Sequence, residues 1–116
     1  MKIKLSHSYL AAFSFLVASI DDLLQNEKHI AINTPGLKHE YNRKVINSSI
    51  ELITDLNKHL KKKLIDNKGT YSINMLQATA LVIHQYFHLV IATNEYTKNS
   101  IRDIIIEIDQ ILINNP

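Results

Sequence analysis

Residues 9–24 read YLAAFSFLVASIDDLL, and the apolar side chains of this stretch recur at the spacing of one helical face. With successive residues about 100° apart around a helix, the large apolar side chains fall on one stripe. The stripe consists of Tyr9, Leu10, Phe13, Leu16, Val17, Ile20, Leu23 and Leu24. Ser14, Asp21 and Gln25 lie outside it. The stretch therefore predicts an amphipathic helix with one side buried in a core.

The chain contains few residues that interrupt helices, with only two glycines and two prolines. Pro35-Gly36 and Gly69 are the internal breaks, and the polar run 94–100 is rich in residues that cap helices. Four helices are expected within these limits, over about residues 7–27, 35–67, 72–94 and 98–114. Thr34 before Pro35 is expected to begin the second helix, Gly69 to follow it, and Thr70 or Ser72 to cap the third.

The later segments also show helical spacing of apolar residues. The stripe of the second segment consists of Tyr41, Val45, Ile46, Leu52, Ile53, Leu56, Leu60 and Leu64. The third segment is apolar around more than half of its circumference, so we expect it to be the most buried helix. The isoleucines of the fourth segment also suit a strand, but its polar residues follow helical spacing better than alternation.

Length and composition favour one all-α domain over residues 1–116. With 116 residues and 46% hydrophobic side chains, the chain is long enough for one core and too short for two domains. Amphipathic helices joined by short connections predict an antiparallel up-down-up-down four-helix bundle.

The composition excludes several classes of activity. The chain has no cysteine, so disulfides, thiolate metal sites and cysteine nucleophiles are absent. It contains no glycine-rich phosphate loop and no nucleophile elbow. The carboxylate pairs Glu51/Asp55 and Asp103/Glu107 lie on outward faces, as solvated side chains do. We therefore expect no catalytic residues and no cofactor.

Two stretches bear on location. Residues 1–20 superficially resemble a signal peptide, but Ser6, His7, Ser8 and Ser14 interrupt the apolar run. Residues 70–94 carry no charged residue, yet Gln77, His84, Gln85 and His88 make a membrane span unfavourable. A cytoplasmic protein without a membrane segment is the expectation.

Two of the expected helices carry apolar residues on the side away from the core. Phe15 lies opposite the main stripe of the first helix, beside the small residues Ala11 and Ala18. Ile106 and Ile113 lie one heptad apart on the back of the fourth helix. A monomeric bundle needs one apolar face per helix, so the second faces predict a subunit interface. We expect a non-catalytic protein that associates with itself, as a homodimer, or with a partner protein. An accessory or immunity-type role rests on analogy of shape alone.

One alternative function is binding to nucleic acid or to an anionic surface. The basic cluster consists of Lys58, Lys61, Lys62, Lys63 and Lys68. Clustered cations bind phosphate by releasing counterions. Cations near the end of a helix also complement its dipole, and no aromatic residue interleaves with these lysines to stack on bases. The association hypothesis is therefore preferred to this one.

A second alternative is a metal site at His84 and His88. Their spacing of four residues puts both imidazoles on one face of a helix, and Glu95 lies near the same direction two turns later. The same side of the helix carries Gln77 and Gln85, so exposure to solvent is the preferred interpretation of the pair.

Overall fold

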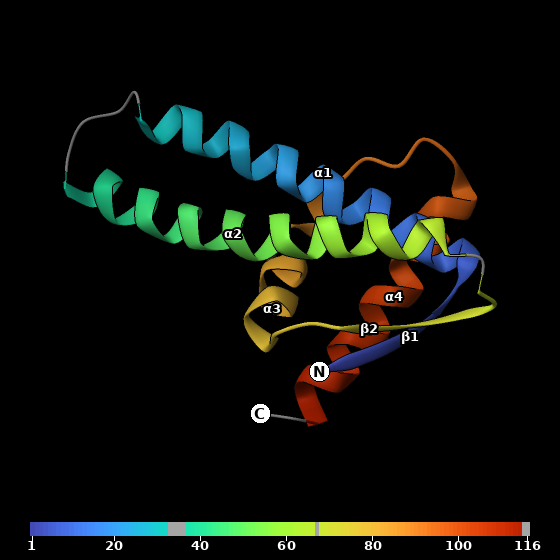
Figure 1. Ribbon diagram of the computed structural model, residues 1–116. Coiled ribbons are helices and arrows are strands. Elements are labelled where there is room, and N and C mark those ends of the chain that lie inside the picture. The colour runs from blue at the N-terminus through green and yellow to red at the C-terminus, as the bar shows by residue number, and fades with distance from the viewer. Residues whose placement is uncertain (33–36, 67, 115–116) are drawn as a thin grey trace.

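The structure, a computed structural model, describes residues 1–32, 37–66 and 68–114 (Figure 1). These residues are mostly helical, as the sequence predicted. The described helices are α1 (His7–Ile32), α2 (Leu37–Ile65), α3 (Gln77–Tyr86), the short 3-10 helix η1 (Phe87–Leu89) and α4 (Glu95–Asn114). The expected cap at Thr34 and Pro35 lies outside the described residues.

A two-stranded antiparallel sheet accompanies the helices, so the chain is not purely α-helical. Strand β1 (Lys2–Ser6) pairs with β2 (Thr70–Asn74), with Ile3 opposite Ile73 and Leu5 opposite Tyr71. In both strands the apolar residues alternate with polar ones, and the apolar side chains are buried. This alternation presents one face of the ribbon to the core and leaves the other in solvent.

The third helix is shorter than the sequence predicted. Residues 70–74, including the expected caps Thr70 and Ser72, belong to β2. The helix begins after Leu76 and ends at Tyr86, and η1 follows. Four of its ten residues are buried, Thr79, Ala80, Val82 and Ile83, which is a larger share than in the described part of any other α-helix. The longer α1 buries more residues in number: Leu10, Ala12, Phe13, Leu16, Val17, Ile20 and Leu24.

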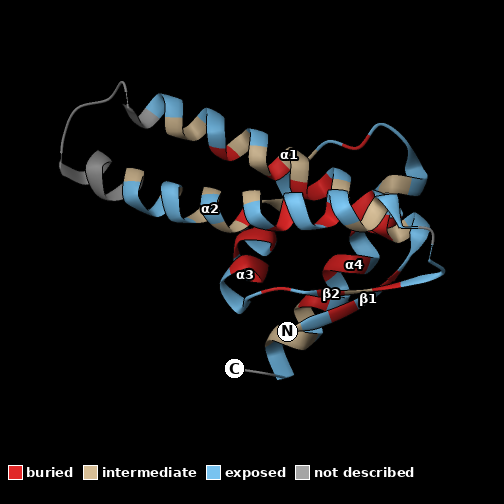
Figure 2. Ribbon diagram, viewed as in Figure 1, coloured by how far each residue is buried: buried red, intermediate tan, exposed pale blue. Residues whose placement is uncertain are grey.

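Helices α1 and α2 form a long antiparallel hairpin, and the other elements gather at the half of it that contains the start of α1 and the end of α2 (Figure 1). The core occupies that half, where α1 and α2 meet α3, α4 and the sheet (Figure 2). Toward the far end of the hairpin, none of residues 25–30 in α1 or 43–52 in α2, the part whose burial the structure describes, is buried. Val45, expected in the core stripe, is exposed because no third element covers this part of the hairpin.

Polar side chains fix the connections between these elements. The buried Tyr71 hydroxyl donates to the carbonyl of Asp66, accepts from the backbone N–H of Lys68 at 3.0 Å and lies 3.1 Å from Nδ1 of His7. One side chain of β2 thus joins the end of α2 to the start of α1.

The beginnings of α1 and α4 are capped by side chains. Ser6 Oγ accepts a hydrogen bond from the backbone N–H of Tyr9 at 3.3 Å, and Asn94 Oδ1 accepts one from Thr97 at 2.7 Å. Both satisfy N–H groups that have no partner within the helix. The polar run 94–100 therefore starts a helix, as its composition indicated.

The lengths and hydropathy of the described helices also bear on location. None of them combines the length and apolar character that crossing a bilayer requires.

Candidate association surfaces

The outward face of α1 is apolar where the sequence indicated. Phe15 has 40% of its surface exposed, Ala11 is exposed and Ala18 is half-buried. Phe15 and Ala11 border a hollow of about 310 Å³ that lies between α1 and the segment 93–97, which leads into α4. Thus the apolar surface of α1 is a shallow concave site rather than a flat helix face.

The outward face of α4 carries apolar side chains that are more exposed than Phe15. Ile106 is 52% exposed and Ile113 is 73% exposed. Four other isoleucines of this helix are buried on the opposite side: Ile101, Ile104, Ile105 and Ile108. Within the single chain, α4 therefore carries isoleucines on two sides, one buried and one exposed, and the exposed side also holds Arg102 and Gln110.

A second hollow lies along α4, between this helix and the segment that follows α3. Its volume is about 420 Å³. Its lining combines six apolar residues with two cations: Phe87, Val90, Ala92, Ile101, Ile105, Ile106, Lys98 and Arg102. We call this hollow the α4 groove. It includes Ile106 but not Phe15, Ala11 or Ile113.

The two histidines considered as an alternative metal site do not share an α-helix. α3 ends at Tyr86, so His84 lies in α3 and His88 in η1, and Glu95 begins α4. Nε2 of His84 lies 2.7 Å from a carboxylate oxygen of Asp109, and its ring lies against Phe87 with centroids 5.8 Å apart. Among the described residues, no three His, Cys, Asp or Glu side chains form a group that would hold a metal ion.

The basic cluster does not form one surface patch. Lys58, Lys61 and Lys62 are exposed on α2, Lys63 is half-buried and Lys68 follows the helix. At about 100° per residue these lysines spread over more than half of the circumference of α2. Cations spread in this way present fewer charges to one phosphate backbone than a single stripe would.

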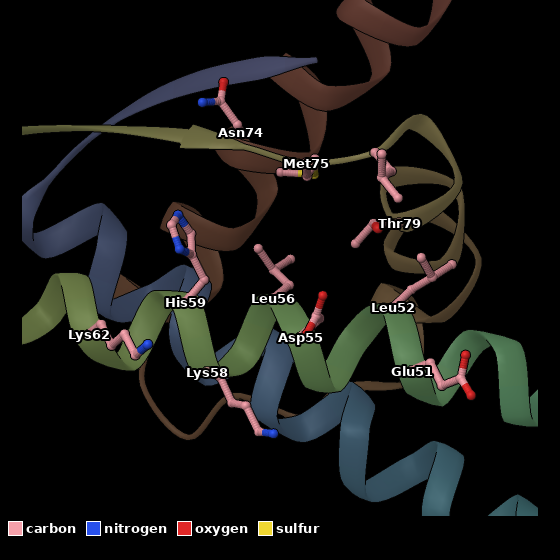
Figure 3. A pocket seen from close by; sticks show the side chains of 11 residues that line it. Glu51, Leu52, Asp55, Leu56, Lys58, His59, Lys62, Asn74, Met75 and Thr79 are labelled. Atoms are coloured by element: carbon pink, nitrogen blue, oxygen red, sulfur yellow. The ribbon is translucent and has the colours of Figure 1, made fainter.

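Lys58, His59 and Lys62 instead border a cavity of about 630 Å³ between α2 and the β2–α3 connection (Figure 3). Leu52, Leu56 and Met75 supply its apolar lining, and Glu51 and Asp55 also border it. Figure 3 shows His59 and Leu56 directed from α2 toward β2, whereas Lys58 and Lys62 point away. Because charges of both signs border this cavity, its electrostatics favour neither an anionic nor a cationic ligand.

Sequence reasoning missed the cavity beside α2, the α4 groove and the partner of His84. The cavity beside α2 depends on β2, and the α4 groove depends on where α3 ends. Asp109 and His84 are brought together by the packing of α4 on α3, which helical spacing within each segment does not indicate.

The chain matches no family model, and comparison with characterised proteins and with solved structures found no significant similarity.

Proposed function

We propose that this chain is a non-catalytic protein that works by association, in the first place with a second copy of itself, through the outward faces of α4 and α1. The observation that carries the proposal is the exposure of Ile106 and Ile113 on the side of α4 opposite its buried isoleucines. Removing apolar surface from water lowers the free energy by about 25 cal/mol per Å².

The positions of the two isoleucines suit a twofold-symmetric contact. They lie one heptad apart on one stripe of α4, with the polar residues Asp109 and Gln110 between them, so they supply two apolar contact points rather than a continuous seam. In an antiparallel pair of α4 helices, Ile106 of one copy faces Ile113 of the other, and the contact occurs twice. A stable dimer buries about 1,200–2,000 Å² in total, so the apolar hollow beside Phe15 is expected to contribute as well.

Sedimentation velocity across a concentration series tests the proposal. We expect the wild-type chain to sediment as a dimer at micromolar concentration, and the double variant Ile106→Lys/Ile113→Lys to sediment as a monomer. Ile65→Lys is the matched control, because Ile65 is 83% exposed at the end of α2 and lies outside the proposed interface. A wild-type monomer at every concentration would overturn self-association.

Two finer parts of the proposal concern architecture and location. We propose that the four helices form an antiparallel up-down-up-down bundle and that the protein is cytoplasmic. The antiparallel α1–α2 hairpin supports the first (Figure 1). The absence of cysteine suits the second, because reducing compartments do not use disulfides.

A further inference from the structure

The α4 groove combines a buried apolar floor with partly exposed walls. Ala92, Ile101 and Ile105 are buried beneath it, whereas Phe87 and Val90 on one side are half-buried. The other side is a ridge of α4 formed by Lys98, Arg102 and Ile106, each four residues apart. Residues at this spacing lie one above another on a helix, so the ridge runs the length of the groove.

The volume and lining resemble those of sites for small ligands. Such sites commonly enclose about 300–1,000 Å³, and most of their lining is apolar with a few polar groups that orient the ligand. The α4 groove has a volume of about 420 Å³ and two polar side chains in its lining.

Both polar side chains are cations, and they lie at one end of the ridge. Nζ of Lys98 is 3.7 Å from the Glu95 carboxylate, a contact between two exposed side chains that contributes little. Arg102 donates a hydrogen bond to Oδ1 of Asn99 at 3.2 Å. Among the described residues, no carboxylate lies within ion-pairing distance of Arg102, so its charge is open to an anion.

Beyond the other end of the ridge, past Ile106, the electrostatic character is opposite. Asp109 lies one turn beyond Ile105 on α4 and is paired there with His84, whose ring contacts Phe87. A negative ligand group is therefore favoured beside Lys98 and Arg102 and disfavoured near Asp109. The apolar residues Phe87, Ile105 and Ile106 lie between the two ends.

We infer that the α4 groove binds a single-chain carboxylate amphiphile, with its carboxylate beside Lys98 and Arg102 and its hydrocarbon chain along Ala92, Ile105 and Phe87. The apolar floor suits the hydrocarbon chain of such a ligand, and the two cations suit its carboxylate. This inference does not require the chain to form a dimer.

Isothermal titration calorimetry with sodium decanoate, below its micellar concentration and at neutral pH, measures the binding. Decyltrimethylammonium has the same hydrocarbon chain with a cationic head group and serves as the matched ligand control. We expect saturable binding of one decanoate per chain and much weaker binding of the cation. Amide chemical shifts should change at residues 87–92 and 98–106.

A double variant tests the role of the cations. Lys98→Gln/Arg102→Gln should raise the Kd for decanoate about three- to thirtyfold, as expected for two exposed ionic contacts. Lys61→Gln/Lys62→Gln removes the same net charge from exposed positions on α2 and should leave the Kd unchanged. Circular dichroism checks that both variants fold as the wild type does.

Ile113→Lys separates this site from the proposed dimer interface, because Ile113 does not line the groove. It should weaken self-association without weakening decanoate binding, although Ile106 belongs to both surfaces. Equal affinity for decanoate and decyltrimethylammonium would overturn the inference, as would an equal loss of affinity in the two double variants. Absence of saturable decanoate binding would overturn it as well.

Discussion

The Tyr86 hydroxyl donates a hydrogen bond to the carboxylate of Glu27 at 2.9 Å and so joins the end of α3 to α1. Burial is the main reason that the pKa of Tyr86 is raised to about 12, and the Glu27 hydrogen bond is the second. Both effects favour the neutral phenol over the phenolate. The contact therefore has a consequence for stability in alkaline solution.

The folded chain should lose stability as the pH rises from about 10 to about 12. In that range the unfolded chain, whose tyrosines have a pKa near 10, loses its Tyr86 proton before the folded chain does. Below about pH 10 the contribution is fully present. Melting temperatures measured across this range should fall less steeply for Tyr86→Phe than for the wild type.

Glu27→Gln serves as the control for the cause of the Tyr86 shift. This substitution removes the negative charge of Glu27 but leaves Tyr86 as buried as before. The pKa of Tyr86 should therefore fall but stay above its ordinary value. The phenolate absorbance of Tyr86, taken as the difference between each background and its Tyr86→Phe variant, gives this pKa. Subtraction is needed because the pKa of Tyr9 is also raised, by its hydrogen bond to Asp103. A Glu27→Gln titration identical to the wild type would contradict a role for the carboxylate.

Tyr71→Phe should destabilise the chain by about 1–3 kcal/mol. The substitution keeps the ring in the core and removes the hydroxyl that contacts Asp66, Lys68 and His7. The carbonyl and N–H groups that it leaves must find other partners. Urea unfolding measures the change, and Tyr96→Phe is the control because Tyr96 is an exposed tyrosine on α4. Equal effects of the two substitutions would mean that the Tyr71 hydroxyl contributes no more than an exposed one.

Ile73→Ala should cost about 2–5 kcal/mol of unfolding free energy, because Ile73 is buried in β2 and its removal leaves a cavity. Ile65→Ala removes the same atoms from an exposed position on α2 and should change stability by no more than about 0.5 kcal/mol. Chemical denaturation of both variants measures the difference. A small effect at Ile73 would show that the sheet contributes little to the core.

Zinc should leave the melting temperature unchanged, both on addition to the purified, untagged chain and on removal with a chelator. The physical reason is that His84 is engaged by Asp109, while His88 lies beyond the end of α3. A ligand that binds the folded state raises its stability with concentration. Stabilisation by zinc that is lost in His84→Ala would instead establish a site at this histidine.

Much of the helical structure was predictable because it depends on local sequence. α1 begins at His7 as predicted, and α4 begins at Glu95, near the predicted start, where Asn94 caps it. The exposure of Phe15, Ile106 and Ile113 was also predictable, because direction around a helix follows from spacing alone. Whether another copy covers these residues stays a prediction.

The sheet was not predictable by the same reasoning. The alternation of Ile3 with Leu5 and of Tyr71 with Ile73 is present in the sequence, but five residues are too few to separate a strand from the end of a helix. The pairing joins distant parts of the chain. Once β2 takes residues 70–74, the third helix must begin later, and the α4 groove exists only because that helix also ends early, at Tyr86.

The β1–β2 pairing has a consequence for the order in which the chain assembles. During synthesis β1 is made first, yet its partner emerges only after both long helices have left the ribosome. The α1–α2 hairpin needs only neighbouring segments and can form before then, whereas Ile3 and Leu5 stay uncovered in the nascent chain. Contacts between distant segments form slowly, so closing this ribbon is expected to be a late step that completes the core.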